Sequence, residues 1–320
     1  MRLLIAPDKL KGTYTAPEAA AALARGWRSL RPDDELALVP LADGGEGTTA
    51  VLLEARGGAW RRVPAHDAHG RPIEAAYAKL PGREAALDVA EACGMWRVAD
   101  LEPDALSASS FGAGELIRHA IGGGARRIIV GVGGTASSDG GEGLRLALGA
   151  MPKGVELVAA LDVNNPLLGP TGAAAVYGPQ KGAITPQLVE RLEQRLAALD
   201  LPTAALPGAG AGGGIGGMLM ALGATAVPGA RLVLDEVGFG RRLATAELCI
   251  TAEGRIDGQT MRGKVVATVA AACVEAGVDC VAVAGEVEPE AGAALDRMGV
   301  ATLPCGDLER AGARLAADRL

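Results

Sequence analysis

Residues 131–143 read GVGGTASSDGGEG, and they follow the apolar run Ile128 to Val130. Leu144, Leu146 and Leu148 come directly afterwards, with a spacing that we interpret as helical. The pattern therefore predicts a strand, a glycine-rich loop and a helix. The backbone N–H groups of such a loop, at the start of a helix, are a favourable place for an anion.

The second half of this loop, DGGEG, occurs twice in the chain, at 43–47 and at 139–143, each time after a predicted strand. The two acids of each copy have the spacing of a helix capping box. A plain cap does not explain the adjacent glycines, because glycine in a helix costs about 0.8–1 kcal/mol relative to alanine. We therefore expect a bulky group, such as a phosphate carried with Mg²⁺, close to the backbone. The acids are Asp43, Glu46, Asp139 and Glu142.

Composition and charge limit the classes of partner. Of the 320 residues, 49% are hydrophobic, which is enough for the cores of two modest domains. Aromatic residues make up 2% of the chain and its formal net charge is −7, so we exclude general binding to nucleic acids and to anionic membranes. An anionic substrate would need local lysines, local arginines or a metal ion.

Cysteine usage and the N-terminal sequence favour the cytoplasm. The five cysteines include no CxxC pair, which is typical of reduced thiols. The N-terminal sequence MRLLIAPDKLKG lacks the apolar segment of a signal peptide. No apolar stretch reaches the roughly 18 residues that a membrane-spanning helix needs.

Strand, loop and helix patterns alternate along most of the chain, which predicts an α/β fold with a mainly parallel sheet. The segments 60–64 and 73–80 interrupt this alternation, because they predict an antiparallel hairpin. We place a domain boundary near residue 62. Ligands of parallel sheets bind beyond the carboxyl ends of the strands, and the unusual loops all occupy that position.

Residues 258–264, GQTMRGK, nearly match the phosphate-binding loop GxxxxGK[ST]. The last position is Val265, which cannot ligate Mg²⁺, so a standard loop of this kind is excluded. Lys264 still opens a predicted helix after a glycine turn. It is either a phosphate contact or a solvated lysine.

Acids and bases also follow other predicted strands. Glu253 and Asp257 flank Arg255, and these three residues either satisfy one another as ion pairs or hold metal and phosphate. Asp8 and Lys11 offer the same combination after the first strand. Each set is a candidate site for an anion.

The segment 207–217, PGAGAGGGIGG, contains matches to GxGxxG, but a chain with 47 glycines makes such matches by chance. Neither match is followed by the strand and the acid of a dinucleotide site, so we disfavour NAD binding. Lys181 lies between Gly178 and Gly182, which suggests close approach of the backbone.

Together these blocks resemble the bacterial type-1 glycerate kinases, in the order of that family and over nearly the whole chain. The blocks are APDKLKGT at 6–13, PLADGGEGT at 40–48, GVGGTASSDGGEG at 131–143, LDVNNPL at 161–167, GPQKGA at 178–183, PGAGAGGGIGG at 207–217 and TAEGRIDGQT at 251–260.

This resemblance implies phosphorylation of D-glycerate with ATP and Mg²⁺, giving 2-phosphoglycerate or 3-phosphoglycerate. It also implies two α/β domains with a cleft between them. A discontinuous, Rossmann-like domain with a mainly parallel sheet is expected at 1–62 plus 232–320, and a mixed α/β domain at 63–231 is inserted in it. D-glycerate is then the small-molecule partner, and the sequence leaves a homodimer open.

Within this resemblance we assign roles by residue type, and either Asp8 or Asp257 is expected to orient the attacking hydroxyl. The catalytic candidates are Asp8, Lys11, Asp139 and Asp257. The candidates for binding phosphate and the substrate carboxylate are Lys181, Arg255, Lys264, Gly131, Gly133, Gly134, Gly212, Gly213 and Gly214. The metal candidates are Asp43, Glu46, Glu142 and Glu253.

Two other classes of protein stay open at this point. One is an NAD-dependent oxidoreductase of a small hydroxy acid, and the other is a binding protein that closes on a carboxylate without chemistry. For the kinase, Asp139→Asn is expected to lower kcat by at least ~10²-fold with an intact fold, since it would remove a charge partner of the phosphoryl group.

Overall fold

The computed structural model describes residues 1–10 and 12–319. Contacts divide the chain into two compact units. Unit 1 comprises Met1–Asp43 and Ala230–Leu320, and unit 2 comprises Gly44–Gly229. The first boundary lies at residue 43 and not near residue 62, because helix α2 (Thr48–Arg56) packs against the sheet of unit 2.

Unit 1 is built on a parallel sheet with the strand order β11-β10-β9-β1-β2. Its strands are β1 (Arg2–Ile5), β2 (Glu35–Leu38), β9 (Leu248–Ile256), β10 (Asp279–Val287) and β11 (Ala301–Pro304). The chain leaves β1 toward β2 on one side, whereas β9 lies on the other side of β1. Such a reversal opens a ligand-binding crevice at the carboxyl ends of the two strands.

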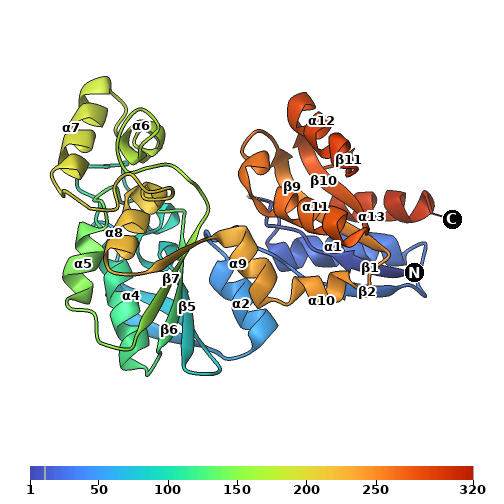
Figure 1. Ribbon diagram of the computed structural model, residues 1–320, viewed down its shortest axis with the longest axis horizontal. Coiled ribbons are helices and arrows are strands. Elements are labelled where there is room, and N and C mark those ends of the chain that lie inside the picture. Colours follow the sequence, from blue (N-terminus) through green and yellow to red (C-terminus); the bar gives the residue numbers. More distant parts are fainter. Residues whose placement is uncertain (11, 320) are drawn as a thin grey trace. The chain divides into compact units, whose positions relative to one another are not determined.

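Helices cover both faces of this sheet. The helices are α1 (Ala16–Arg28), α9 (Gly229–Glu236), α10 (Phe239–Leu243), α11 (Val265–Ala276), α12 (Pro289–Arg297) and α13 (Leu308–Ala317). Thr15 and Glu18 form a capping box at the start of α1. The helices α1 and α13 lie side by side (Figure 1) and cross at Gly26 and Gly312, where a Cβ would collide with the backbone of the other helix.

Unit 2 contains a mixed sheet with the order β3-β4-β5-β6-β7-β8. Its strands are β3 (Ala59–His66), β4 (Pro72–Leu80), β5 (Glu84–Asp88), β6 (Arg127–Val132), β7 (Glu156–Leu161) and β8 (Thr225–Pro228). The strands β3 and β4 pair antiparallel, as the hairpin pattern predicted, and β5 to β8 pair in parallel. The loop after β6 is the GVGGTASSDGGEG segment.

The helices of unit 2 follow the predicted loops. They are α2, α3 (Ala90–Cys93), α4 (Phe111–Gly122), α5 (Glu142–Leu148), α6 (Ala173–Tyr177), α7 (Pro186–Ala197) and α8 (Ile215–Ala221), with short 3-10 turns between some of them. The N-cap of α7 is Thr185, and its hydroxyl accepts from the N–H of Leu188 at 3.2 Å. Within residues 1–10 and 12–319, no helix combines the length and the apolar character needed to cross a bilayer.

Candidate functional site

Two buried acids lie at the carboxyl ends of neighbouring central strands in unit 1. Asp8 follows β1, and its N–H donates to the carbonyl oxygen of Ala252 in β9 at 2.8 Å, so both strands hold it in place. Glu253 is the next residue of β9. Asp8 is 5% exposed and Glu253 is 6% exposed. The two acids therefore occupy the reversal point of the sheet.

Burial raises the pKa of both carboxyl groups to near neutral pH. Burial and the negative charge of Asp43 raise the pKa of Asp8 to about 7, against the opposing effect of Lys9. Burial also raises the pKa of Glu253 to about 7, against a hydrogen bond from Thr260. A carboxyl group that titrates near pH 7 can accept and release a proton under physiological conditions.

Two lysines place positive charge near these acids. The Nζ of Lys9 lies 3.7 Å from Oδ1 of Asp43. Lys264 is the N-cap residue of α11, and its positive charge lowers the pKa of both Asp8 and Glu253. Unit 1 therefore brings together predicted residues from four separate stretches of the chain. We call this set, Asp8, Asp43, Glu253 and Lys264, the acid–lysine cluster.

Asp257, the alternative to Asp8, takes part in a turn. Its Oδ1 accepts from the N–H groups of Gln259 at 2.7 Å and Thr260 at 3.2 Å. The hydroxyl of Thr260 donates to Oε1 of Glu253 at 2.5 Å. The turn thus orients Glu253, and of the two aspartates Asp8 has the geometry of a base.

Arg255 lies on the surface. Its guanidinium pairs with Glu288 at 2.7 Å and with Glu286 at 3.5 Å, and not with the two acids that flank it in sequence. Lys11, the other predicted cation of this unit, lies outside the described residues.

In unit 2, the first glycine turn packs against the loop after β6. A Cβ at Gly131 would lie 3.0 Å from the carbonyl oxygen of Gly44, and a Cβ at Gly133 would lie 2.9 Å from the Cα of Gly45. Gly134 has a φ of +68°, which favours glycine. The close approach of two backbone segments therefore accounts for these glycines.

Asp88, at the end of β5, holds the start of α2, and we did not single it out from the sequence. Its carboxylate accepts from the N–H of Gly47 at 2.8 Å and from the N–H and hydroxyl of Thr49 at 3.1 and 2.8 Å. The N-cap of α2 is Gly47, so Asp43 does not occupy the capping position of a capping box. In the sequence, Asp88 is marked only as an acid within the apolar segment 85–90.

Asp139 is a buried structural carboxylate that is 2% exposed. It accepts hydrogen bonds from five donors at the starts of α4 and α5. The donors are the hydroxyl of Ser109, the N–H and hydroxyl of Ser110, and the N–H groups of Gly141 and Gly143, at 2.8 to 3.3 Å. The geometry therefore favours a role in joining two helices over the predicted catalytic role.

The second glycine turn is also crowded by protein atoms. The N–H of Gly140 donates to the carbonyl oxygen of Gly213 at 3.0 Å, and a Cβ at Gly213 would lie 2.2 Å from the carbonyl oxygen of Ser137. The residues Gly212 to Gly214 all have positive φ. The structure thus brings segment 212–214 against the loop after β6, and internal packing explains the glycines for which we expected a ligand.

Lys181 is a buried cation beside the same loop. Its Nζ donates to the hydroxyl of Thr135 at 3.0 Å and to the carbonyl oxygen of Ser137 at 2.8 Å. Burial lowers the pKa of this ammonium group to about 8, although the charges of Cys93 and Asp139 oppose the shift. The neighbouring hydroxyl of Ser138 is buried and has no hydrogen-bond partner within the described chain. A buried polar group of this kind indicates a place for a ligand or a water molecule.

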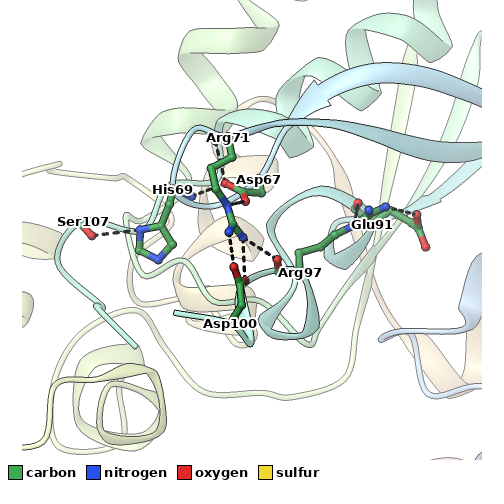
Figure 2. Close-up of polar contacts among 7 residues, drawn as sticks. All are labelled: Asp67, His69, Arg71, Glu91, Arg97, Asp100 and Ser107. Carbon is green, nitrogen blue, oxygen red and sulfur yellow. Dashed lines mark hydrogen bonds and ion pairs between the residues drawn. The ribbon is translucent and has the colours of Figure 1, made fainter. Parts of the chain in front are cut away.

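A polar network ties the β3–β4 hairpin to the segment before α4 (Figure 2). The Arg71 guanidinium lies between Asp67 and Asp100, at 2.5 and 2.6 Å, and also donates to the carbonyl oxygen of Arg97 at 2.9 Å. The carbonyl oxygen of Ala68 in the hairpin accepts from the N–H of Ser109 at 2.8 Å. The network therefore positions the serines that bind Asp139.

Within residues 1–10 and 12–319, no three carboxylates have ligand atoms that all lie within 4.8 Å of one another. Among the described residues, one group of three metal-ligating side chains lies within 4.8 Å, and it consists of cysteines. Mg²⁺ is usually bound through one or two carboxylates together with phosphates, so Asp43 and Glu253 have suitable chemistry. On unit 2, Glu46 is exposed and Glu142 is partly exposed, and their roles stay predictions.

The sequence matches the Glycerate kinase family over residues 3–154 and 150–309. It is 37% identical over 324 residues to a glycerate kinase from Halalkalibacterium halodurans, covering 89% of this chain and 85% of that protein. It is also 35% identical over 332 residues to glycerate 2-kinase from Escherichia coli K12, covering 91% of this chain and 87% of that protein.

The fold of this chain is also similar to that of a solved structure. It belongs to a protein provisionally named glycerate kinase 2 from Salmonella typhimurium LT2. The TM-score is 0.80 at 34% sequence identity, and the match covers 100% of this chain and 98% of the other. The predicted α/β class, with a parallel sheet and a second mixed sheet, is thereby confirmed.

Proposed function

Because the chain belongs to the glycerate kinase family, we propose that it transfers the γ-phosphoryl group of ATP to the 2-hydroxyl of D-glycerate, giving 2-phosphoglycerate and ADP. The name of the Escherichia coli relative, glycerate 2-kinase, supports the 2-hydroxyl as the acceptor. The family match favours the kinase over the two alternatives, which are an oxidoreductase and a binding protein without chemistry.

The observation that carries this proposal is the position and pKa of Asp8. A kinase of a small alcohol needs a group that accepts the hydroxyl proton as the oxygen attacks phosphorus. Asp8 is fixed between two central strands at the reversal point, and its pKa of about 7 suits that task at neutral pH. Glu253, with a similar pKa, is oriented by Thr260 and shares the same site.

Each unit, taken by itself, contains a lysine that is suited to bind an anionic group. In unit 1, Lys264 stands at the start of α11, where backbone N–H groups add to its attraction for anions. In unit 2, Lys181 uses two of its three N–H donors within the described chain, so one is left for an oxyanion. Phosphoryl transfer depends mainly on such positioning and charge neutralisation.

ATP is the proposed donor and Mg²⁺ the proposed metal. Mg²⁺ supplies neutralisation of phosphate charge when it is bound. The hard oxygen donors of Asp43 and Glu253 fit this ion, and their small number fits a site completed by nucleotide phosphates. We also propose a cytoplasmic location, supported by the five cysteines, which are all free in the structure.

Phosphorus NMR of the reaction product tests the proposal. Incubation with D-glycerate, ATP and Mg²⁺ is expected to give a phosphate ester whose phosphorus signal is a doublet, because C2 of glycerate carries a single proton. A triplet would assign transfer to the 3-hydroxyl. No ester, together with NAD reduction in the absence of ATP, would contradict the kinase proposal.

The pH dependence of kcat/KM follows from the raised pKa of Asp8. The base must be ionised, so kcat/KM is expected to fall about tenfold per pH unit below pH 7 and to level off above it. Initial rates at saturating ATP from pH 5 to 9 measure this profile, with the coupling enzymes in excess at each pH. If kcat/KM stays constant down to pH 5, the reaction does not depend on a base with a pKa near 7.

A further inference from the structure

Three cysteines of unit 1 meet in its core, away from the acid–lysine cluster. Cys249 in β9 and Cys280 in β10 are directly paired in the parallel register, so their side chains point to the same face of the sheet. Cys273 comes from α11, which packs on that face. The three sulfur atoms all lie within 4.8 Å of one another. We call these residues the cysteine triad.

The cysteine triad is buried from solvent, and its candidate ligand atoms are all sulfur. Cys249 and Cys273 are 0% exposed and Cys280 is 5% exposed. In the part of the chain that the structure describes, no histidine or carboxylate joins this group as a fourth ligand. A structural zinc site takes four ligands, so the triad does not match zinc. Three thiolates alone suit a soft ion of low coordination number.

The size of the triad fits an ion bound at its centre. A metal–sulfur bond of about 2.3 Å places three sulfur ligands roughly 3.5–4 Å apart. The triad already lies within 4.8 Å, so binding needs only small side-chain movements.

The charge of the bound ion determines which soft ion suits the cysteine triad. Three thiolates around a monovalent or divalent cation leave net negative charge in a dry core, which is costly to bury. A trivalent ion balances the three thiolates and leaves a neutral complex. We propose that the cysteine triad is a binding site for a trivalent thiophilic metalloid, with arsenous acid as the probe.

The binding reaction is a ligand exchange without a change in oxidation state. Arsenous acid, As(OH)₃, is neutral at pH 7 and can enter an apolar core through local opening of the fold. Three As–O bonds break and three As–S bonds form. Each thiol proton leaves with a hydroxide as water, so three water molecules are released and no net charge is created.

The test uses the full-length native protein, reduced with a phosphine and incubated overnight with arsenite. Native mass spectrometry is expected to show a single adduct whose mass gain is one arsenic atom less three hydrogens. Arsenic X-ray absorption is expected to show three sulfur neighbours and no oxygen neighbour. The melting temperature is expected to rise, because the ligand binds the folded state.

Variants assign the adduct to the triad. Cys249→Ala, Cys273→Ala and Cys280→Ala are each expected to weaken binding on the order of 10²-fold or more, since the third thiol acts at high effective concentration. Cys305→Ser, which changes a partly exposed cysteine of the same unit, is the matched control and is expected to bind like the wild type.

The wild-type measurements can overturn the proposal by themselves, so it does not depend on the folding of any variant. No adduct, an arsenic atom with an oxygen neighbour, or an adduct that persists in Cys273→Ala and is lost in Cys305→Ser would each contradict it. The test uses no turnover, so its failure is distinct from failure of the proposed kinase activity.

Discussion

Replacing Asp8 with asparagine is expected to lower kcat by about 10²–10⁴-fold, the range for loss of a general base. Asparagine has nearly the same shape and cannot accept the hydroxyl proton. The KM values for ATP and D-glycerate are expected to change much less, because the lysines and backbone N–H groups of the site stay in place. Steady-state kinetics at pH 8, where the wild-type carboxyl group is ionised, measures the effect.

The same substitution is expected to stabilise unit 1 at pH 8, which separates a catalytic role from a structural one. The pKa of Asp8 is raised from 3.8 to about 7 on folding, so its contribution to stability is present below pH 3.8 and is lost as the pH rises through 7. Asparagine stays neutral and avoids this loss. The expected result is therefore a higher melting temperature at pH 8 together with a large loss of kcat.

Asp257→Asn is the matched control for Asp8→Asn. Its carboxylate accepts only backbone N–H groups of its own turn, which an amide oxygen can also do, so kcat is expected to stay within about tenfold of the wild type. If Asp257→Asn loses activity and Asp8→Asn keeps full activity, Asp257 is the base and Asp8 is not.

Replacing Asp139 with asparagine is expected to destabilise unit 2 by about 2–4 kcal/mol, the cost of leaving buried donors unsatisfied beside a lost charge. The carboxylate accepts from five donors, whereas the amide offers one acceptor oxygen and turns its NH₂ group toward the remaining N–H groups. This outcome replaces the expectation of an intact fold, and any loss of kcat would follow from displacement of the glycine loop. Urea unfolding monitored by circular dichroism measures the change.

Glu142→Gln is the control for this second variant. Glu142 belongs to the same DGGEG turn but is partly exposed at the start of α5, so its replacement is expected to leave the free energy of unfolding within about 0.5 kcal/mol. If Asp139→Asn has wild-type stability and reduced kcat, Asp139 acts in the chemistry and not through the fold.

Local patterns in the sequence predicted the fold class and several elements. The hairpin of β3 and β4 was predicted because two extended segments of similar length flank a polar turn. The N-caps of α1 and α7, Thr15 and Thr185, are equally local features, because a cap is specified within four residues. By contrast, β8 and the helices α9 and α10 were not predicted. β8 and α10 have only four and five residues, whereas the apolar residues Ala230, Val233 and Leu234 of α9 do have helical spacing.

The functional clusters were predicted only in part, because partners distant in sequence set their properties. An acid after a strand was enough to nominate Asp8 and Glu253, but their burial and raised pKa depend on the pairing of β1 with β9. Capping of α2 by Asp88 spans 41 residues, and no local rule specifies it. The crowded glycines illustrate the same limit, since a nearby protein backbone and a nearby phosphate favour the same residue type.

The central strand β1 obtains its two neighbours at very different times during synthesis. β2 follows it after a single helix, but β9 is made only after the whole of unit 2 has been synthesised. Until then, one edge of Leu3, Leu4 and Ile5 has no backbone partner, although unit 2 can already fold as a unit. The nascent chain therefore carries an apolar, half-paired strand through most of its translation, and an unpaired strand edge of this kind is prone to pair with other chains.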